Sequence, residues 1–210
     1  MGWSTPKGAF EAELSVVADF AIDNLTAAIV VVAQLGHSLD DIARCLESLP
    51  GVPGRMEIVS FDRAHPLVVV DYAHTPDALD KALAALRPHC RGQLACVVGC
   101  GGDRDAGKRP QMAQVATRGA DRVMFTSDNP RSEPPQAIID DMLKGIEGMD
   151  VDVQSHVDRR AAIRAALTAA ETIDTVLIAG KGHESYQEIE GVRVDFDDRS
   201  VARALLEEWV

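Results

Sequence analysis

The stretch PLVVVDYAHTPDALDKALAAL, residues 66–86, contains the pattern that decides the predicted fold. LVVV is an uninterrupted apolar run, typical of a strand whose two faces are both covered. Thr75 is placed to cap the helix that follows, and Pro76 suits the first helical position, where no N–H is needed. The stretch therefore predicts a buried strand joined to an amphipathic helix by the polar loop DYAHTPD, residues 71–77.

The same alternation of strand-like and helix-like segments continues to the end of the chain. Further strand-like runs are MEIVSF (56–61), LACVVG (94–99), DRVMFT (121–126), VDVQSHV (151–157), DTVLIAG (174–180) and GVRVDF (191–196). Helix-like segments lie around residues 109–119, 134–146, 158–171 and 200–209. Such alternation predicts an α/β fold, with a doubly wound, mostly parallel sheet and helices on both faces.

The N-terminal quarter of the chain has a different character. The first twenty residues follow no clear period, and Asn24 then stands where a helix N-cap would precede LTAAIVVVAQLG. Ser38 begins a second predicted helix, SLDDIARCLESL, before PGVPGR (50–55) breaks the pattern. Two helices cannot bury a core by themselves, so we expect residues 1–55 to be an incomplete domain and residues 56–210 a complete one.

Composition excludes several classes of protein. The formal net charge of -12 argues against nucleic acid as the main partner. The longest apolar run, AAIVVVAQLG, is too short to cross a bilayer, and no signal peptide is recognisable, so we expect a soluble, cytoplasmic protein without membrane contact. The four cysteines form no CxxC pair and have no adjacent histidine, which predicts free thiols and no metal site.

Polar loops follow four of the predicted strands. They are DYAHTPD (71–77), CGGDRDAGKRP (100–110), SDNPRSEPP (127–135) and GKGHESYQ (180–187). Each loop taken singly also fits an ordinary turn. Ligands of doubly wound sheets bind at the carboxyl ends of the strands, however, and four such loops at one edge are improbable by chance. We therefore expect the four loops to form one site.

Two common phosphate-binding motifs are missing from these loops. GGDRDAGKR is not a GxxxxGK[ST] loop, because Arg109 stands where Ser or Thr is required. GCGGDRDAG lacks the glycine spacing of a dinucleotide fingerprint, because Arg104 occupies the sixth position from Gly99. The absence of that fingerprint argues against a nicotinamide-dependent oxidoreductase.

The charges in the loops suit a ligand that carries both signs. Cations come from Arg104, Lys108, Arg131 and Lys181, and anions from Asp103, Asp128 and Glu184. Arginine presents a planar fork that matches a carboxylate, and carboxylates together with Asn129 can hold an ammonium group. A zwitterion such as an amino acid fits this pattern. His74 and His183 are either acid–base groups or hydrogen-bonding neighbours.

Five ordered segments carry a family resemblance: GVPGRME, VVDYAHTPDALDKAL, VVGCGGDRDAGKRPQM, SDNPRSEPPQAIIDDM and AGKGHESYQ. From about Asn24 onward, the chain closely resembles the Mur ligases of peptidoglycan synthesis, in particular those that add meso-diaminopimelate. The resemblance implies a Rossmann-like C-terminal domain for residues 56–210. It also implies that residues 1–55 are the last helices of a central ATPase domain, and that an N-terminal domain precedes them.

The resemblance also implies a reaction, its reactants and a set of site residues. The family forms an amide bond with ATP and Mg²⁺: a carboxylate of the UDP-N-acetylmuramoyl dipeptide becomes an acyl phosphate, which the amine of the amino acid attacks. The residues that match the family's diaminopimelate site are Arg104, Asp128, Asn129, Pro130, Arg131, Gly180 and Glu184. Those that match its nucleotide-facing positions are Asn24, Arg55, Asp71, His74 and Asp77. The tetrapeptide DNPR resembles the motif of family members that add diaminopimelate rather than the motif of those that add lysine.

Two departures from the family pattern limit what this chain is expected to do alone. No GxxxxGK[ST] loop occurs, so we expect the isolated chain neither to hydrolyse ATP nor to form the amide bond. The family's FNVxNLLAA is here FAIDNLTAA, in which Ala21 replaces an asparagine. The alternative to a ligase domain is a non-catalytic amino-acid-binding module that kept the fold without the ATPase domain.

Overall fold

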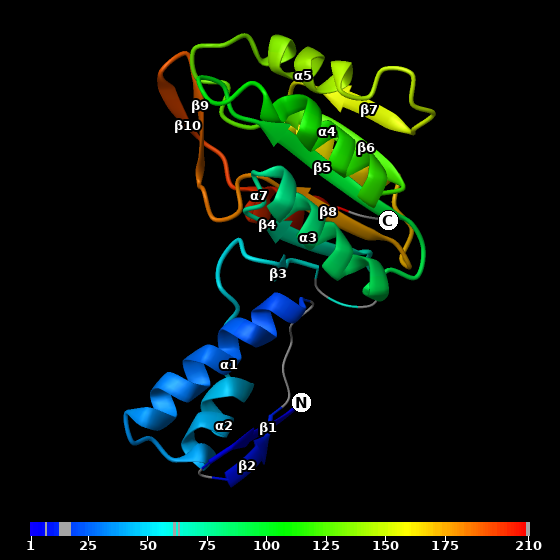
Figure 1. Ribbon diagram of the computed structural model, residues 1–210. Helices are drawn as coiled ribbons and strands as arrows, with labels where there is room; N and C mark the ends of the chain where they lie inside the picture. The colour runs from blue at the N-terminus through cyan, green and yellow to red at the C-terminus, as the bar shows by residue number, and fades with distance from the viewer. Residues whose placement is uncertain (7, 13–17, 61, 63, 209–210) are drawn as a thin grey trace. The chain divides into compact units, whose positions relative to one another are not determined.

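The computed structural model describes residues 1–6, 8–12, 18–60, 62 and 64–208. The chain forms two compact units, Met1–Val52 and Pro53–Val210, and the division falls within the PGVPGR segment (Figure 1). Among the described residues, no helix is long and apolar enough to cross a membrane.

The Met1–Val52 unit packs two helices against a hairpin. Strands β1 (Gly2–Thr5) and β2 (Gly8–Glu11) pair antiparallel and are followed by helices α1 (Asp19–Gln34) and α2 (Leu39–Glu47). Trp3 stacks on Phe10, with ring centroids 5.4 Å apart, and its indole N–H donates to Thr26 Oγ1 at 2.9 Å. The small core is completed by Ala12, Ile29, Ala33, Ile42 and Leu46.

One of the two predicted helix caps in this unit is confirmed and the other is wrong. Ser38 caps α2, because its side chain accepts a hydrogen bond from Asp41 N at 3.1 Å. Asn24 does not cap α1, which begins at Asp19 and places Asn24 inside the helix. Ile22, Leu25 and Ile29 share one helical face, so the apolar period runs back past Asn24 and extends the helix.

The Pro53–Val210 unit is built on a six-stranded sheet in the order β3-β4-β8-β5-β6-β7. Strands β4 (Leu67–Asp71), β8 (Thr175–Ala179), β5 (Leu94–Cys100), β6 (Arg122–Ser127) and β7 (Val153–His156) are parallel. The two-residue strand β3 (Glu57–Ile58) pairs antiparallel with β4. The predicted mostly parallel α/β sheet is therefore confirmed.

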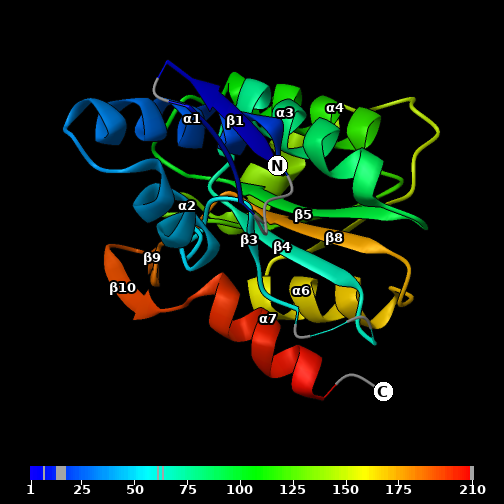
Figure 2. The same ribbon diagram turned by 90° about the horizontal axis from the view of Figure 1, so that it is seen from below.

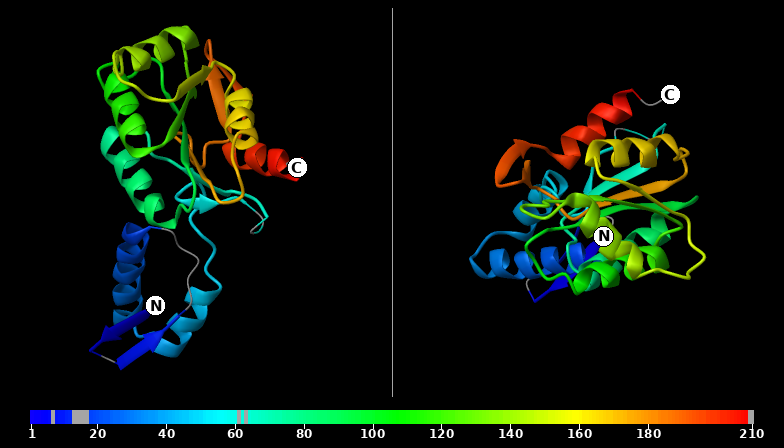
Figure 3. Two further views of the ribbon diagram at one scale, coloured as in Figure 1. Left: turned by 90° about the vertical axis from the view of Figure 1, so that its right-hand side faces the viewer. Right: turned by 90° about the horizontal axis from the view of Figure 1, so that it is seen from above.

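Helices cover both faces of this sheet (Figures 2 and 3). Helices α3 (Pro76–Leu86), α4 (Lys108–Gly119) and α5 (Pro135–Lys144) pack side by side on one face, and α6 (Arg159–Thr168) and α7 (Asp198–Glu207) pack on the other. A 3₁₀ turn, η1 (Arg87–His89), follows α3. Thr75 Oγ1 accepts from Ala78 N at 3.3 Å, which confirms the predicted cap of α3.

The core lies between the sheet and these two helical layers. Val70, Val97 and Ile178 are fully buried against α6 and α7. On the other face, Leu79, Leu83 and Met112 are equally buried. Burying each such side chain contributes roughly 1.5–3 kcal/mol to the free energy of unfolding. The strands that carry the loops are therefore held in a well-packed core.

The segment GVRVDF does not join the main sheet, contrary to the sequence-based expectation. It forms β10 (Val192–Asp195), which pairs antiparallel with β9 (Tyr186–Ile189) in a separate hairpin. Glu190 and Gly191 link the two strands with φ of 50° and 75°. Two consecutive positive φ values give a tight hairpin turn, which sends the chain straight back along β9.

The four cysteines are free thiols, as predicted. Cys45 is exposed, Cys90 is partly buried, and Cys96 and Cys100 are buried in β5. Burial raises the pKa of the Cys96 and Cys100 thiols to about 12, so both stay protonated at neutral pH.

Candidate functional site

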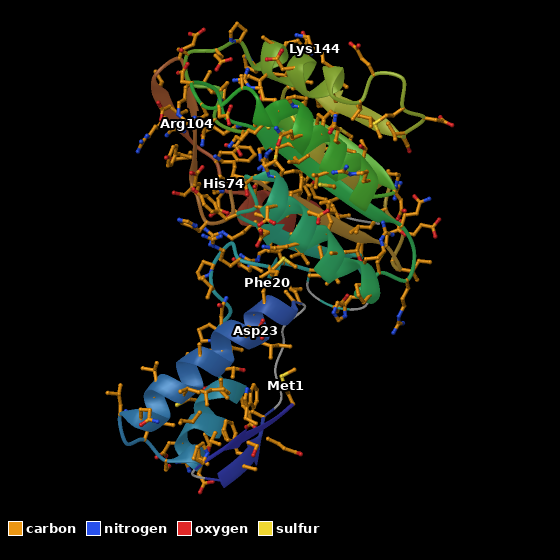
Figure 4. The ribbon with its side chains drawn as sticks, in the orientation of Figure 1. Met1, Phe20, Asp23, His74, Arg104 and Lys144 are labelled. Atoms are coloured by element: carbon orange, nitrogen blue, oxygen red, sulfur yellow. The ribbon has the colours of Figure 1, made fainter. Side chains whose placement is uncertain are left out.

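The carboxyl ends of four neighbouring strands meet at one edge of the Pro53–Val210 unit. Strands β4, β8, β5 and β6 are adjacent in the sheet, and each is followed by one of the four polar loops. Figure 4 shows Arg104 and His74, from two of these loops, at the edge where β9 and β10 stand. The expected convergence of the loops is therefore present.

The loops that follow β5 and β6 are hydrogen-bonded to each other. Gly102 N donates to Asn129 O at 2.9 Å, and Arg131 Nη1 donates to Gly102 O at 2.7 Å. The Asp103 carboxylate accepts from the backbone N–H and the hydroxyl of Ser132. A Cβ on Gly102 would lie 2.0 Å from Pro130 O, so this close approach needs glycine.

Arg131 is fixed by its backbone as well as by its side chain. Its φ is 51°, a left-handed conformation that few residues other than glycine adopt. Its N–H donates to Glu188 O at 2.8 Å and its carbonyl accepts from Glu190 N at 2.6 Å, which docks the loop on β9. Its guanidinium is therefore held in place before any ligand arrives.

Asn129, Lys181 and Glu184 form a buried polar network beside this loop. Lys181, which is 0% exposed, donates from Nζ to Glu184 Oε2 at 3.0 Å and to Asn129 Oδ1 at 3.2 Å. Asn129 Nδ2 donates to the same Glu184 oxygen at 2.8 Å. Both donors thus use Oε2, and among the described residues no donor is found for Oε1.

Asp128 is a buried acid at the bottom of the same site. Burial raises the pKa of its carboxyl group, although the positive charges of Arg159 and Lys181 oppose this effect. A Cβ on Gly180 would lie 2.6 Å from Asp128 Oδ2, so the carboxylate rests directly on the glycine backbone. Within the described part of the chain, no hydrogen bond to this carboxylate is found.

The seven residues predicted to bind the amino acid thus come from three adjacent loops. Arg104 is exposed, Arg131 and Glu184 are half-buried, and Asp128, Asn129, Pro130 and Gly180 are buried. Cationic and anionic groups are present together, so the arrangement suits a ligand with both a carboxylate and an ammonium group.

The residues predicted to face a nucleotide have different surroundings. The Arg55 guanidinium lies 4.7 Å from the centre of the Tyr72 ring, which also contacts the rings of His74 and His183 at 4.6 and 5.3 Å. Lys108 Nζ donates to His74 O at 3.0 Å. This exposed group of cation and aromatic rings is compatible with a phosphate or a base.

Two acids from that predicted set are engaged within the protein, and one residue belongs to the other unit. Asp71 is buried, has a pKa raised by burial, and accepts from Met56 N at 2.8 Å, so it supports the turn that carries Arg55. Asp77 is exposed and pairs with Lys81 at 2.8 Å. Asn24 is exposed within α1 of the Met1–Val52 unit.

Sequence reasoning missed several residues of this site. It did not foresee that Tyr72 would be the centre of the aromatic group, or that β9 would bond both Arg131 and Asn129. Gln187, buried in β9, donates to Asp128 O at 2.8 Å. The alternation in YQEIEGVRVD was the one available signal for the hairpin.

The chain is similar to a solved structure over nearly its whole length. The structure of a UDP-N-acetylmuramoyl-L-alanyl-D-glutamate--2,6-diaminopimelate ligase matches 98% of this chain and 42% of its own, with a TM-score of 0.74 and 45% identity. Residues 54–182 match the family described as Mur ligase, glutamate ligase domain. The chain belongs to this family.

Two curated relatives bear the same name as that structure. The protein from Prochlorococcus marinus subsp. pastoris is 44% identical over 209 residues, which are 97% of this chain and 41% of the relative. The protein from Synechococcus sp. (strain WH7803) is 49% identical over 209 residues, covering 98% and 42%. The chain thus spans about two fifths of the length of these relatives.

Proposed function

We propose that this chain supplies the amino-acid-binding domain of an ATP-dependent ligase that adds meso-diaminopimelate to UDP-N-acetylmuramoyl-L-alanyl-D-glutamate in peptidoglycan biosynthesis. The observation that carries the proposal is the buried network of Asn129, Lys181 and Glu184, which lies at the strand ends in the same loops as Asp128 and Arg131. The names of the relatives support the choice of diaminopimelate as the amino acid.

The charged residues of the site suggest how the two ends of a zwitterion would be held. Arg131 and the exposed Arg104 would bind a carboxylate of diaminopimelate, Arg131 through its planar fork. Asp128 and the remaining oxygen of Glu184 would accept hydrogen bonds from an ammonium group. Because Lys181 and Asn129 already fix Glu184, the site would lose little conformational entropy when the ligand binds.

Specificity against lysine would depend on the distal end of the ligand. Lysine has an ammonium group at its side-chain end but no second carboxylate there, so with lysine bound Arg131 would keep its bond to Gly102 O but lack a carboxylate partner. A site that leaves a polar partner unpaired discriminates strongly against the incomplete ligand.

The domain would contribute to catalysis chiefly by position. Holding the amine of the amino acid beside the activated carboxylate of the other substrate removes entropy that a bimolecular encounter must lose, an effect worth roughly 7–11 kcal/mol in well-oriented reactions. None of the described side chains of this chain needs to form a covalent bond in such a role.

ATP and Mg²⁺ would act in the complete enzyme, where they supply the phosphoryl group and the charge compensation for carboxylate activation. From this chain, the exposed Arg55 and His74 would contact a nucleotide, and Asp71 would orient Arg55 through the 54–56 turn. The described residues contain no group of acids and histidines that could hold a metal, so no residue here is assigned to Mg²⁺.

Residues 1–55 would form the last part of the central ATPase domain, and residues 56–210 the C-terminal domain of a cytoplasmic enzyme. The surface of α1 and its C-cap supports this assignment, because Val30 and Val31 are 50% and 58% exposed and the C-cap residue Leu35 is 75% exposed. A helix that is apolar around most of its circumference is typical of one that is covered by further protein.

Isothermal titration calorimetry of the 210-residue chain tests the proposal. We expect meso-diaminopimelate to bind, and L-lysine to bind at least tenfold more weakly. Binding of both with equal affinity, or of neither, would contradict the proposed function. Ligase turnover by the chain, with ATP and the UDP-linked dipeptide present, would contradict the expectation that the isolated chain is catalytically incomplete. If the chain binds the amino acid but its full reading frame encodes no ATPase domain, the alternative of a non-catalytic binding module is favoured.

A further inference from the structure

A buried ion pair lies beneath the candidate site, formed by the first residues of two helices. Arg159 begins α6 and Asp198 begins α7, and the two side chains are fully buried. Arg159 Nε donates to Asp198 Oδ1 at 2.8 Å, and Nη2 donates to Oδ2 at 2.7 Å. The pair is therefore bidentate and shielded from solvent.

The same guanidinium also binds the ends of two strands. Nη1 donates to Ser127 O at 3.1 Å, and Nη2 donates to Ala179 O at 3.0 Å. Ser127 is the last residue of β6 and Ala179 the last residue of β8, so the next residues are Asp128 and Gly180. Two loops of the candidate site thus begin one residue beyond a carbonyl that Arg159 holds.

These two strands are not neighbours in the sheet. Strand β5 lies between β6 and β8, so no ladder hydrogen bond fixes the ends of β6 and β8 relative to each other. Arg159, on α6, bridges the two strand ends because it donates to a carbonyl of each. Its planar guanidinium has five N–H donors in a fixed geometry, so it can set the spacing of both carbonyls at once.

Arg159 also shapes the charge around Asp128. The charged groups that act on this carboxylate are Arg159 from α6, Asp198 from α7, and Lys181 and Glu184 from the loop after β8. Burial raises the pKa of Asp128, and Arg159 is the strongest of the influences that oppose this rise. The guanidinium thus favours the ionised form, which an ammonium ligand requires.

We propose that Arg159 is a positioning residue of the amino-acid site, which holds the loops that begin at Asp128 and Gly180 at the spacing that a zwitterionic ligand needs. Arg159 is 1% exposed and acts through Ser127, Ala179 and Asp198 without touching the ligand. The inference rests on the proposed function, since the ligand in question is the amino acid.

The first experiment separates positioning from support of the fold. In the double variant Arg159→Met/Asp198→Leu, apolar side chains of similar shape replace the ion pair, a change that is often neutral for stability because no charge stays buried alone. The two carbonyls nevertheless lose their common donor. We expect the variant to keep a cooperative thermal transition and to bind meso-diaminopimelate at least tenfold more weakly by calorimetry.

Arg122→Met provides the matched control. Arg122 begins β6 at the opposite end from Ser127, pairs with Asp174 at 3.0 Å and donates to Ala169 O at 2.6 Å. It therefore resembles Arg159 in its partners but lies away from the site. Unchanged affinity in Arg122→Met, together with the loss in the double variant, supports the proposal. A folded double variant with parental affinity overturns it.

Two further measurements keep the test decisive. If the double variant does not fold, Arg159→Lys replaces it, because an ammonium group keeps the charge but has three N–H donors for the four hydrogen bonds of Arg159 and cannot form the planar bidentate pair with Asp198. Parental affinity in that variant also overturns the proposal.

If the parent chain itself does not bind meso-diaminopimelate, the proposed function fails. The ligand-free amide NMR shifts of Asp128 and Gly180 then decide the positioning role: shifts unchanged in the folded variant overturn it, and shifts that move support it.

Discussion

Arg131 combines an unfavourable backbone conformation with a side chain that is already in place. Its φ of 51° is sustained by two backbone hydrogen bonds, one to Glu188 in β9 and one to Glu190 in the turn that follows β9. Such strain costs of order 1–3 kcal/mol and persists only where the surroundings determine it, often at ligand sites. The position of Arg131 therefore suits a residue that receives a ligand without rearranging.

Replacement of Arg131 tests its role at the distal carboxylate. Arg131→Lys keeps the charge but loses the planar fork, so we expect the affinity for meso-diaminopimelate to fall by roughly ten- to hundredfold, corresponding to about 1.5–3 kcal/mol. The affinity for L-lysine should change much less. Calorimetry with both ligands measures this difference, with the exposed Arg91→Lys as control. An equal loss for both ligands would show that Arg131 only shapes the loop.

The buried Asp128 carboxyl group is expected to lower the stability of the fold while it contributes to ligand binding. Because burial raises its pKa, the folded chain binds this proton more tightly than the unfolded chain, whose carboxyl has the ordinary value of 3.8. The free energy of unfolding therefore falls as the pH rises from about 3.8 through the folded-state pKa, so burial of this carboxyl group opposes folding above about pH 3.8.

Asp128→Asn should relieve this opposition and weaken binding at the same time. We expect Tm at pH 7 to rise, by roughly 2–4 °C for each 1 kcal/mol gained, and the advantage over the parent to shrink as the pH is lowered toward about 4. The affinity for meso-diaminopimelate should fall. Thermal unfolding across this pH range measures the effect, with exposed Asp80→Asn as control. A Tm advantage that is independent of pH would refute the explanation.

At the scale of elements, the site depends on contacts between loops rather than within them. The loop after β5 touches the loop after β6 through Gly102, and the β9–β10 hairpin docks on the second of these loops. Each loop is thus held by a segment that is distant in sequence. These contacts between distant segments explain how irregular backbone can hold the site residues in defined positions.

Gly102→Ala tests this coupling. A Cβ at this position would meet Pro130 O at 2.0 Å, so the two loops must separate. We expect the affinity for meso-diaminopimelate to fall by about tenfold or more, because a shift of ~1 Å at a positioned site is costly. Gly107→Ala in the same loop is the control, since its Cβ would meet only the flexible Asp105 side chain at 3.2 Å. Similar affinities for the two variants would rule out the coupling.

Local patterns in the sequence were sufficient to predict much of the fold and the convergence of the loops. The apolar run of β4, the Thr75 cap and the alternation of strands with helices led to the parallel sheet and to the meeting of four loops. The left-handed Arg131 was not predictable, because its conformation depends on β9, more than fifty residues away in sequence. Likewise, the burial of Lys181 and the supporting role of Asp71 result from tertiary packing, which no local pattern encodes.

For the whole molecule, the division into two units has a direct consequence for binding. All the residues assigned to the amino acid lie in Pro53–Val210, which has its own sheet and core. The Met1–Val52 unit has a separate small core around Trp3 and Ile29. Each unit therefore has the internal packing of an independent body.

Residues 53–210 alone should therefore keep the site. We expect this fragment to fold cooperatively and to bind meso-diaminopimelate within about twofold of the full chain, because no residue assigned to the amino acid is removed. Circular dichroism and calorimetry measure the two properties, with the full chain as reference. A fragment that folds but has lost its affinity would assign part of the site to residues 1–52.

The distribution of the thiols determines where a chemical label can be attached. Alkylating reagents react with the thiolate, so Cys96 and Cys100, with pKa values near 12, are unreactive in the folded chain. Cys45 on α2 is exposed, whereas Cys90 is partly buried and donates its thiol to Gly92 O. A maleimide dye on a Cys90→Ser background would therefore mark the Met1–Val52 unit at a single atom and leave the sheet that carries the proposed site unmodified.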